Sequence, residues 1–69
     1  MNNAVNEARE KLGLSVSEMA RILGVHRNNV DQWCRGERNP PAIALTAIAM
    51  MVFMAERGLL DEWKTHQQP

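Results

Sequence analysis

The sequence predicts an all-α domain of four to five short helices. Apolar residues recur at the i, i+3, i+4 spacing of helices, and no run alternates with the period of two that marks a strand. Glycines and a Pro-Pro pair divide the chain into segments of helical length. The 69 residues suffice for one domain with a small core. Because the chain contains a single cysteine, it has no internal disulfide, and the helices alone must supply that core.

The first two helices are marked by signals at their ends. We expect the first helix over residues Asn3 to Leu12, with Gly13 as its C-terminal cap. Ser15 and Glu18 have the S-x-x-E spacing of a capping box, so the second helix begins at Ser15. Gly24 ends this helix after barely two turns.

Three further segments complete the chain. A short third helix is predicted from Arg27 to Cys34, followed by a loop over residues 35–40. Pro41 is expected as the first residue of the fourth helix, where its missing N–H costs nothing, and that helix runs to about residue 57. A last helix is expected over residues 59–64 and a flexible tail over 65–69. Residues 1–64 are therefore interpreted as a single domain.

Charge gives only weak guidance to the function. The formal net charge is zero and the pI is near 6.7, so no global field attracts nucleic acid. Residues 20–40 hold four arginines against two acids, a net of +2, whereas residues 41–69 carry a net of −1. The asymmetry weakly favours DNA contact in the middle of the chain. The lone cysteine favours a reducing, cytoplasmic setting.

A tight turn joins the second and third helices. Gly24 can adopt the positive φ that such a turn needs, and Ala20 is small enough to let two steeply crossing helices approach. Val25 and Val30 then fill the space between them. Together, seven residues satisfy the buried positions of a helix-turn-helix: Met19, Ala20, Leu23, Gly24, Val25, Val30 and Trp33.

The segment LGLSVSEMARILGVHRNNVDQWCRGERNPP resembles the helix-turn-helix of the Cro and phage-repressor family of DNA-binding domains. The resemblance includes a tryptophan at the end of the third helix and a Gly-x-Arg-x-Pro loop. It implies a lambda-repressor-like fold with its helix-turn-helix at helices 2 and 3, and double-stranded DNA as the partner. In that family the exposed N-terminal half of the third helix enters the major groove.

Carried over position by position, the resemblance assigns base reading to Arg27, Asn28 and Gln32, with Asn29 nearby. The chemistry of these side chains agrees, because arginine pairs with guanine and Asn or Gln pairs with adenine. Helix capping is the alternative role for the two asparagines. The family often has Gln where this chain has Val16, so that phosphate contact is absent or passes to a neighbouring hydroxyl. Phosphate contacts are expected from Ser17, His26, Arg35, Arg38 and Asn39, although the two arginines could instead be ordinary solvated charges.

The fourth helix is apolar on two sides. Residues 42–55 contain only Thr46 as a polar residue, yet this stretch is too short to span a bilayer, so we expect a buried helix. Ile43, Ala47, Met50 and Met54 form one stripe, and Leu45, Ile48, Ala49 and Val52 form another. Either this is the central helix, surrounded by the others, or one stripe joins a second copy. We favour a homodimer whose interface comprises Ile43, Ala47, Met50, Met54, Leu59, Leu60 and Trp63.

These observations predict a sequence-specific transcriptional repressor that binds an inverted-repeat operator as a homodimer and regulates its own operon. The segment NPPAIALTAIAMM is similar to the anti-CRISPR-associated regulators of phages and mobile elements, which implies this autoregulation. The alternative is an antitoxin or interaction module whose apolar C-terminal half binds a partner protein. An enzyme is not expected, because no nucleophile–base pair, carboxylate pair or phosphate-binding glycine loop is found. No cofactor, metal, small-molecule ligand or membrane partner is expected.

Overall fold

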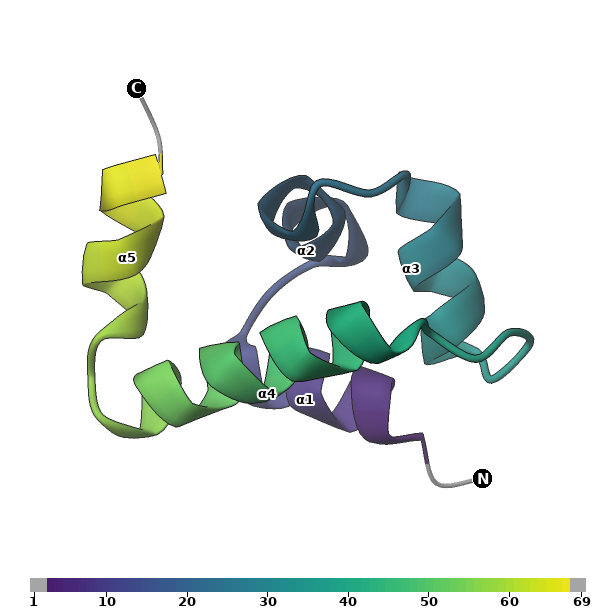
Figure 1. Ribbon diagram of the computed structural model, residues 1–69, viewed down its shortest axis with the longest axis horizontal. Coiled ribbons are helices and arrows are strands. Elements are labelled where there is room, and N and C mark those ends of the chain that lie inside the picture. Colours follow the sequence, from purple (N-terminus) through teal and green to yellow (C-terminus); the bar gives the residue numbers. More distant parts are fainter. Residues whose placement is uncertain (1–2, 68–69) are drawn as a thin grey trace.

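The computed structural model describes residues 3–67, and the elements found there are all helices, as the sequence predicts. α2 and α3 lie next to each other above α1 and α4, and α5 stands at the far end of α4 (Figure 1). No helix in this range is both long and apolar enough to cross a membrane. The five helices are α1 (Ala4–Leu12), α2 (Val16–Leu23), α3 (Arg27–Cys34), α4 (Ala42–Glu56) and α5 (Leu60–Gln67).

Side chains cap the starts of α1 and α2; the capping box at Ser15 was expected, whereas the Asn3 cap was not. The Asn3 side chain accepts hydrogen bonds from the backbone N–H groups of Val5 and Asn6, at 3.0 and 3.1 Å. The capping box is complete, since the Glu18 N–H donates to Ser15 Oγ at 3.0 Å and the Ser15 N–H donates to Glu18 Oε1 at 2.9 Å. These contacts satisfy backbone donors that have no partner within their helices, so the starts of α1 and α2 are fixed locally.

The helix boundaries differ from the expected ones most clearly in α4 and α5, while α1 and α5 each start one residue later than expected. Pro41 is the N-cap of α4 rather than its first residue, because its ψ of 157° is extended. α5 runs to Gln67, so residues 65–67 of the expected flexible tail are helical, while residues 68–69 lie outside the described range. The Thr65 hydroxyl donates to the Asp61 carbonyl at 3.0 Å, which supports this extra turn.

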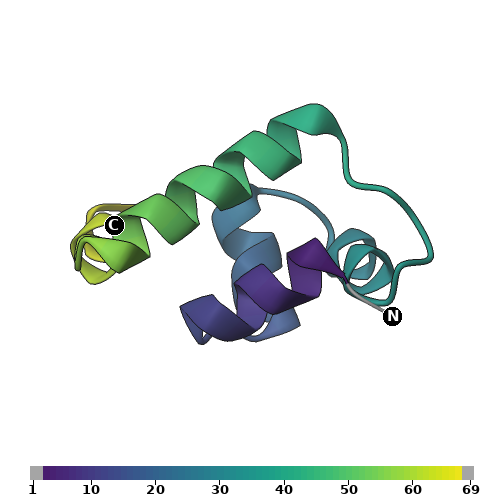
Figure 2. The ribbon, with the colours of Figure 1, turned by 90° about the horizontal axis from the view of Figure 1, so that it is seen from below.

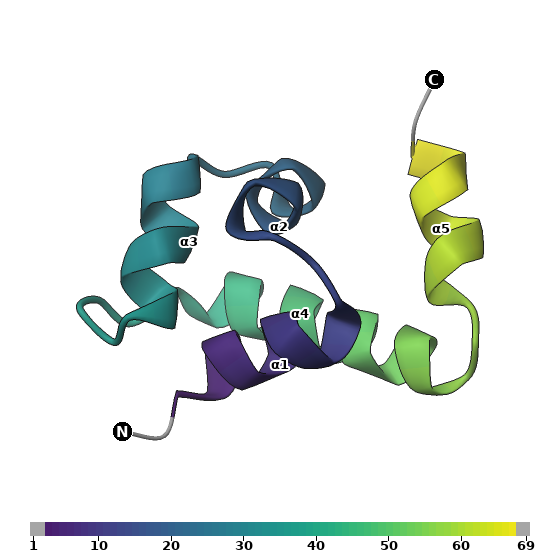
Figure 3. The ribbon, with the colours of Figure 1, turned by 180° about the vertical axis from the view of Figure 1, so that it is seen from behind.

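The core lies where α1, α2, α3 and α4 meet. α1 packs against both α3 and α4, α2 packs against α3, and α4 continues into α5. Figures 2 and 3 show α1 running beside α4, with α3 beyond the N-terminal end of α1. Met19 and Val30 are both 0% exposed. The full core comprises Val5, Leu12, Leu14, Met19, Ala20, Val30, Trp33, Ala44, Ile48, Met51 and Leu60.

α4 buries only one narrow face. Ala44, Ile48 and Met51, at the i, i+4, i+7 spacing of one helical face, are its buried residues. Neither predicted stripe faces the core as a unit, because Ile48 alone of those eight residues is buried. α4 lies at the side of the bundle and exposes most of its length, so the expectation of a buried helix is wrong for the single chain, and so is the alternative of a central helix surrounded by the others. Its large exposed apolar residues are Ile43, Leu45, Met50 and Phe53.

Replacing Met19 with Ala should lower the free energy of unfolding by about 2–5 kcal/mol, because it leaves a cavity between α2 and α3. Urea unfolding followed by circular dichroism measures this. Met50→Ala is the matched control, since Met50 is 61% exposed and its loss should change stability by less than about 0.5 kcal/mol at dilutions where the chain is monomeric. Equal losses for the two variants would contradict the assigned core.

Candidate nucleic-acid interface

The turn between α2 and α3 has the geometry that the sequence predicts. Gly24 has φ +72°, and the Val25 N–H donates to the Ala20 carbonyl at 3.0 Å. A Cβ built on Gly24 would meet nothing within 4 Å, so the backbone conformation and not lack of space requires glycine there. Ala20 is 3% exposed and lies in the core with Val30 of α3. The two short helices are therefore held in one fixed crossing.

α3 turns one face inward and one face outward. Val30 and Trp33 are buried, whereas Arg27, Asn28 and Asn29 in its first turn are exposed. This first turn lies at the end of the molecule remote from α1 and α4 (Figures 1 and 3). The N-terminal end of α3 is therefore a protruding, polar surface that a large partner can reach.

His26 caps α3. Its Nδ1 accepts a hydrogen bond from the Asn28 N–H at 3.1 Å, and its carbonyl accepts one from the Asn29 N–H at 3.0 Å. The capping role considered for Asn28 and Asn29 is thus filled by the histidine. Both asparagine amides are left for other contacts, and His26 itself sits at the edge of the exposed surface.

Gln32 lies one turn below the exposed tip of α3 and is half-buried. Its Oε1 is buried without a hydrogen-bond donor among the described residues. Leaving such an oxygen unpaired costs roughly 1–3 kcal/mol. A movement of this side chain outward, to pair with a base edge, would remove that penalty. Gln32 therefore has an unused hydrogen-bond acceptor next to the exposed first turn of α3.

In the loop after α3 the expected phosphate contacts Arg35, Arg38 and Asn39 are all exposed. The loop is held in place because the Gln32 carbonyl accepts from the Glu37 N–H at 2.9 Å and the Arg38 N–H at 3.4 Å. The remaining expected phosphate contact, Ser17, is exposed near the start of α2. These groups and His26 occupy the ends of α2 and α3 and the adjoining loop.

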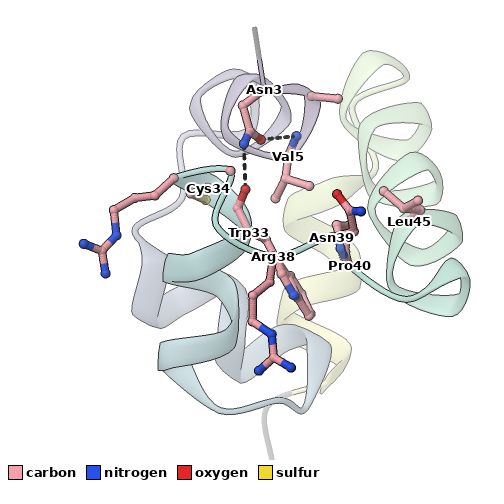
Figure 4. Close-up of a pocket in the computed structure, with 11 residues that line it drawn as sticks. Asn3, Val5, Trp33, Cys34, Arg38, Asn39, Pro40 and Leu45 are labelled. Carbon is pink, nitrogen blue, oxygen red and sulfur yellow. Dashed lines mark hydrogen bonds between the residues drawn. The ribbon is translucent and has the colours of Figure 1, made fainter. Parts of the chain in front are cut away.

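A pocket of about 450 Å³ lies between this loop and the start of α1 (Figure 4). Asn3 Nδ2 donates to the Trp33 carbonyl at 2.7 Å and so ties α1 to the C-terminal end of α3. Arg38 extends away from Asn3 in this view. The pocket lies beside this hydrogen bond, and Arg38 is exposed to solvent.

Arg35 is engaged in the free protein. Its guanidinium donates to the Asp31 carboxylate one helical turn earlier and lies 3.8 Å from the Glu37 carboxylate. The sequence analysis counted Asp31 only as an acid and did not predict its ion pair with Arg35, although an acid four residues before an arginine on a helix is a recognisable pairing signal. The positive charge of Arg35 is thereby offset locally.

The expected interface residues are not all at the surface. Ile43 is 80% exposed, and Met50 and Leu59 are exposed as well, whereas Ala47, Met54 and Trp63 are partly buried. Leu60 is only 8% exposed and belongs to the core of the monomer, so it has little surface to offer a partner. Phe53, 55% exposed, was missed, although it lies three residues after Met50 on the same helix.

Comparison with known proteins agrees with this geometry. Residues 5–50 match the family model described as helix-turn-helix. The chain therefore belongs to the helix-turn-helix family of the Cro and phage-repressor type, whose members are DNA-binding domains.

Over 32 residues the chain is 53% identical to a protein of Archaeoglobus fulgidus named "Putative HTH-type transcriptional regulatory protein". The match covers 46% of this chain and 10% of that protein, so the likeness concerns a small part of the relative. No solved structure matches the chain significantly.

Cys34 should react slowly with thiol reagents, because burial raises the pKa of its thiol and keeps it protonated. Alkylation by iodoacetamide at pH 8 should be slower in the native protein than in a short peptide around Cys34. Urea should restore the peptide rate. A native rate equal to that of the peptide would contradict the assigned burial.

Proposed function

We propose that this chain is a sequence-specific transcriptional repressor that binds double-stranded DNA through α3. The observation that carries the proposal is the exposed first turn of α3, presented by a rigid helix-turn-helix. Arg27 can pair bidentately with guanine, and Asn28 and Gln32 can pair with adenine. Asn29 shares a helical face with Trp33, four residues later, so it lies at the edge of this set of base-reading residues.

The phosphate contacts of this proposal flank the reading surface. His26 lies at the start of α3, the loop residues Arg35, Arg38 and Asn39 follow its end, and Ser17 lies near the start of α2. Contacts of this kind fix the position of a protein on the duplex without reading its sequence. Contacts at both ends of α3 would hold the helix along the groove.

The exposed face of α4 supports a homodimer. Ile43, Met50 and Phe53 present large apolar side chains to solvent on one short helix, which is unusual for a monomer. The neutral chain adds a second reason, because a few phosphate contacts bind weakly at physiological salt and doubling them raises affinity. A two-fold dimer then requires an inverted-repeat operator.

Repression of its own operon is the form of regulation we propose, because occupying a promoter needs only a DNA-reading surface and a dimer contact.

A second candidate function is that of an antitoxin or interaction module, in which the same apolar surface would bind another protein. A pocket of about 550 Å³ lies between α4 and α5 and is lined by Met54, Leu59 and Trp63, among others. If the chain is monomeric, this pocket favours binding of a partner protein.

Binding to the DNA upstream of the chain's own gene tests the proposal, with two arginine variants as a pair. Arg27→Ala should weaken operator binding by about 1–3 kcal/mol and relax selectivity at one base pair, because a bidentate base contact is lost. Arg38→Ala should weaken binding to all sequences alike and lower the slope of log K against log salt by about one. Fluorescence anisotropy titrations over a salt series measure both effects. A sequence-dependent loss for Arg38→Ala, or unchanged selectivity for Arg27→Ala, would reverse the assignments.

Met50→Glu should abolish dimerisation and tight operator binding, because it places a charge in the apolar face of α4. The variant should stay helical, since Met50 is not part of the core. Sedimentation at micromolar concentration and circular dichroism measure the two properties. Leu60→Glu is unsuitable here, because a charge in the core would unfold the monomer. A wild-type monomer that binds a single half-site tightly would exclude the dimer and leave the protein-partner reading.

A further inference from the structure

An acidic side chain lies on the exposed face of α3. Asp31 follows Asn28 by three residues and precedes Gln32 by one, so it shares a helical face with Asn28. Its side chain is 42% exposed. A carboxylate at this place is repelled by DNA phosphates and would weaken binding unless it made a compensating contact. On bound DNA, the Asp31 carboxylate would therefore need a hydrogen-bond donor from a base to offset this repulsion.

The Asp31 carboxylate is paired within α3. Arg35 Nη2 donates to Asp31 Oδ2 one turn along the helix, and Arg35 Nη1 lies 3.8 Å from Glu37 Oε2. Both side chains of the first pair are well exposed, so the pair contributes little to the stability of the fold. A carboxylate accepts through two oxygens, so Oδ1 can accept a further hydrogen bond.

We infer that Asp31 is a specificity-determining residue that accepts a hydrogen bond from the N4 amino group of a cytosine in the major groove. This inference rests on the proposed function. In the major groove guanine offers only acceptors and thymine an acceptor and a methyl, so a carboxylate rejects both. Adenine has an N6 donor, but the N7 acceptor beside it repels the second carboxylate oxygen. Cytosine presents an N4 donor and is the usual base partner of Asp and Glu. Arg35, held by Asp31 and reaching outward, links this base contact to the phosphate backbone.

The same carboxylate disfavours binding to the wrong sequences. On DNA with guanine or thymine at this position, Asp31 meets acceptors and phosphates and receives no hydrogen bond, and adenine offers its N6 donor only beside the repelling N7 acceptor. Non-specific affinity comes almost wholly from phosphate contacts, so one repelled acid at the groove lowers it directly. The residue therefore raises selectivity in two ways, by favouring one base pair and by weakening binding elsewhere.

Selection of bound sequences from a randomised operator library, with wild type and three variants, tests the inference. Wild type should prefer cytosine about tenfold at one position in each half-site. Asp31→Ala should lose this preference and bind non-specific DNA more tightly. Asp31→Asn should change the preference from cytosine to adenine, because an amide pairs bidentately with adenine N6 and N7. Glu37→Gln is the matched control: it removes one negative charge beside the same arginine and should leave every base preference unchanged.

The outcomes separate the two levels of the argument. If wild type selects no sequence at all, the proposed function fails. If wild type is selective and Asp31→Ala gives the same base preferences at every position, only the role of Asp31 is overturned, and Asp31 is an ordinary surface ion-pair partner. Thermal melts of the four proteins confirm that all are folded. A loss of cytosine preference in Glu37→Gln as well would mean that charge alone, and not the Asp31 contact, sets the selectivity.

Discussion

The close crossing of α2 and α3 is the constraint on which the rest of the molecule depends. Each of these helices has eight residues, and helices of that length are not stable alone in water. Met19 and Val30 are fully buried where they meet, and Ala20 beside them keeps the two backbones close. Because the inner face of α3 is fixed in this way, its outer face is fixed as well. The placement of the polar residues of α3 is thus a property of the core behind them.

The N-terminus extends this control to the other end of α3. Asn3 caps α1 through its side-chain oxygen and binds the Trp33 carbonyl through its nitrogen, so one residue orders two helix ends. Arg9 acts similarly, donating from Nη1 to the Leu14 carbonyl at 2.8 Å across the turn between α1 and α2. Neither residue faces the reading surface, yet both hold the elements that carry it. Sequence reasoning focused on the helix-turn-helix did not anticipate these links, because they join residues far apart in the chain or use polar atoms with many possible partners.

The sequence predicts those features of the fold whose signals lie within a few neighbouring residues. The Ser15–Glu18 box and Gly24 act within a few residues, and the helix boundaries and turn that they predicted are observed. The orientation of α4 could not be predicted, because almost every position is apolar and the pattern then does not distinguish one face from another. Leu60 was misjudged for the same reason, as an apolar residue near a chain end fits a core and an interface equally well. The Asp31–Arg35 pair, in contrast, has a local signal, because an acid four residues before an arginine on a helix can pair with it.

Electrostatics and packing together decide what kind of binding this surface can give. Arg35 is offset by Asp31 and Glu37, and the chain as a whole is neutral, so attraction to DNA of arbitrary sequence depends on a few arginines such as Arg38. Affinity must then come from contacts that only some sequences provide, such as those open to Arg27 and Asn28, and from joining two reading surfaces. A single α3 offers too few such contacts for tight binding, whereas a two-fold pair doubles them without adding net charge. In the proposed dimer, the exposed apolar face of α4 and the low net charge of the chain would act together: weak attraction to phosphates would favour selectivity, and association of two copies would recover the lost affinity.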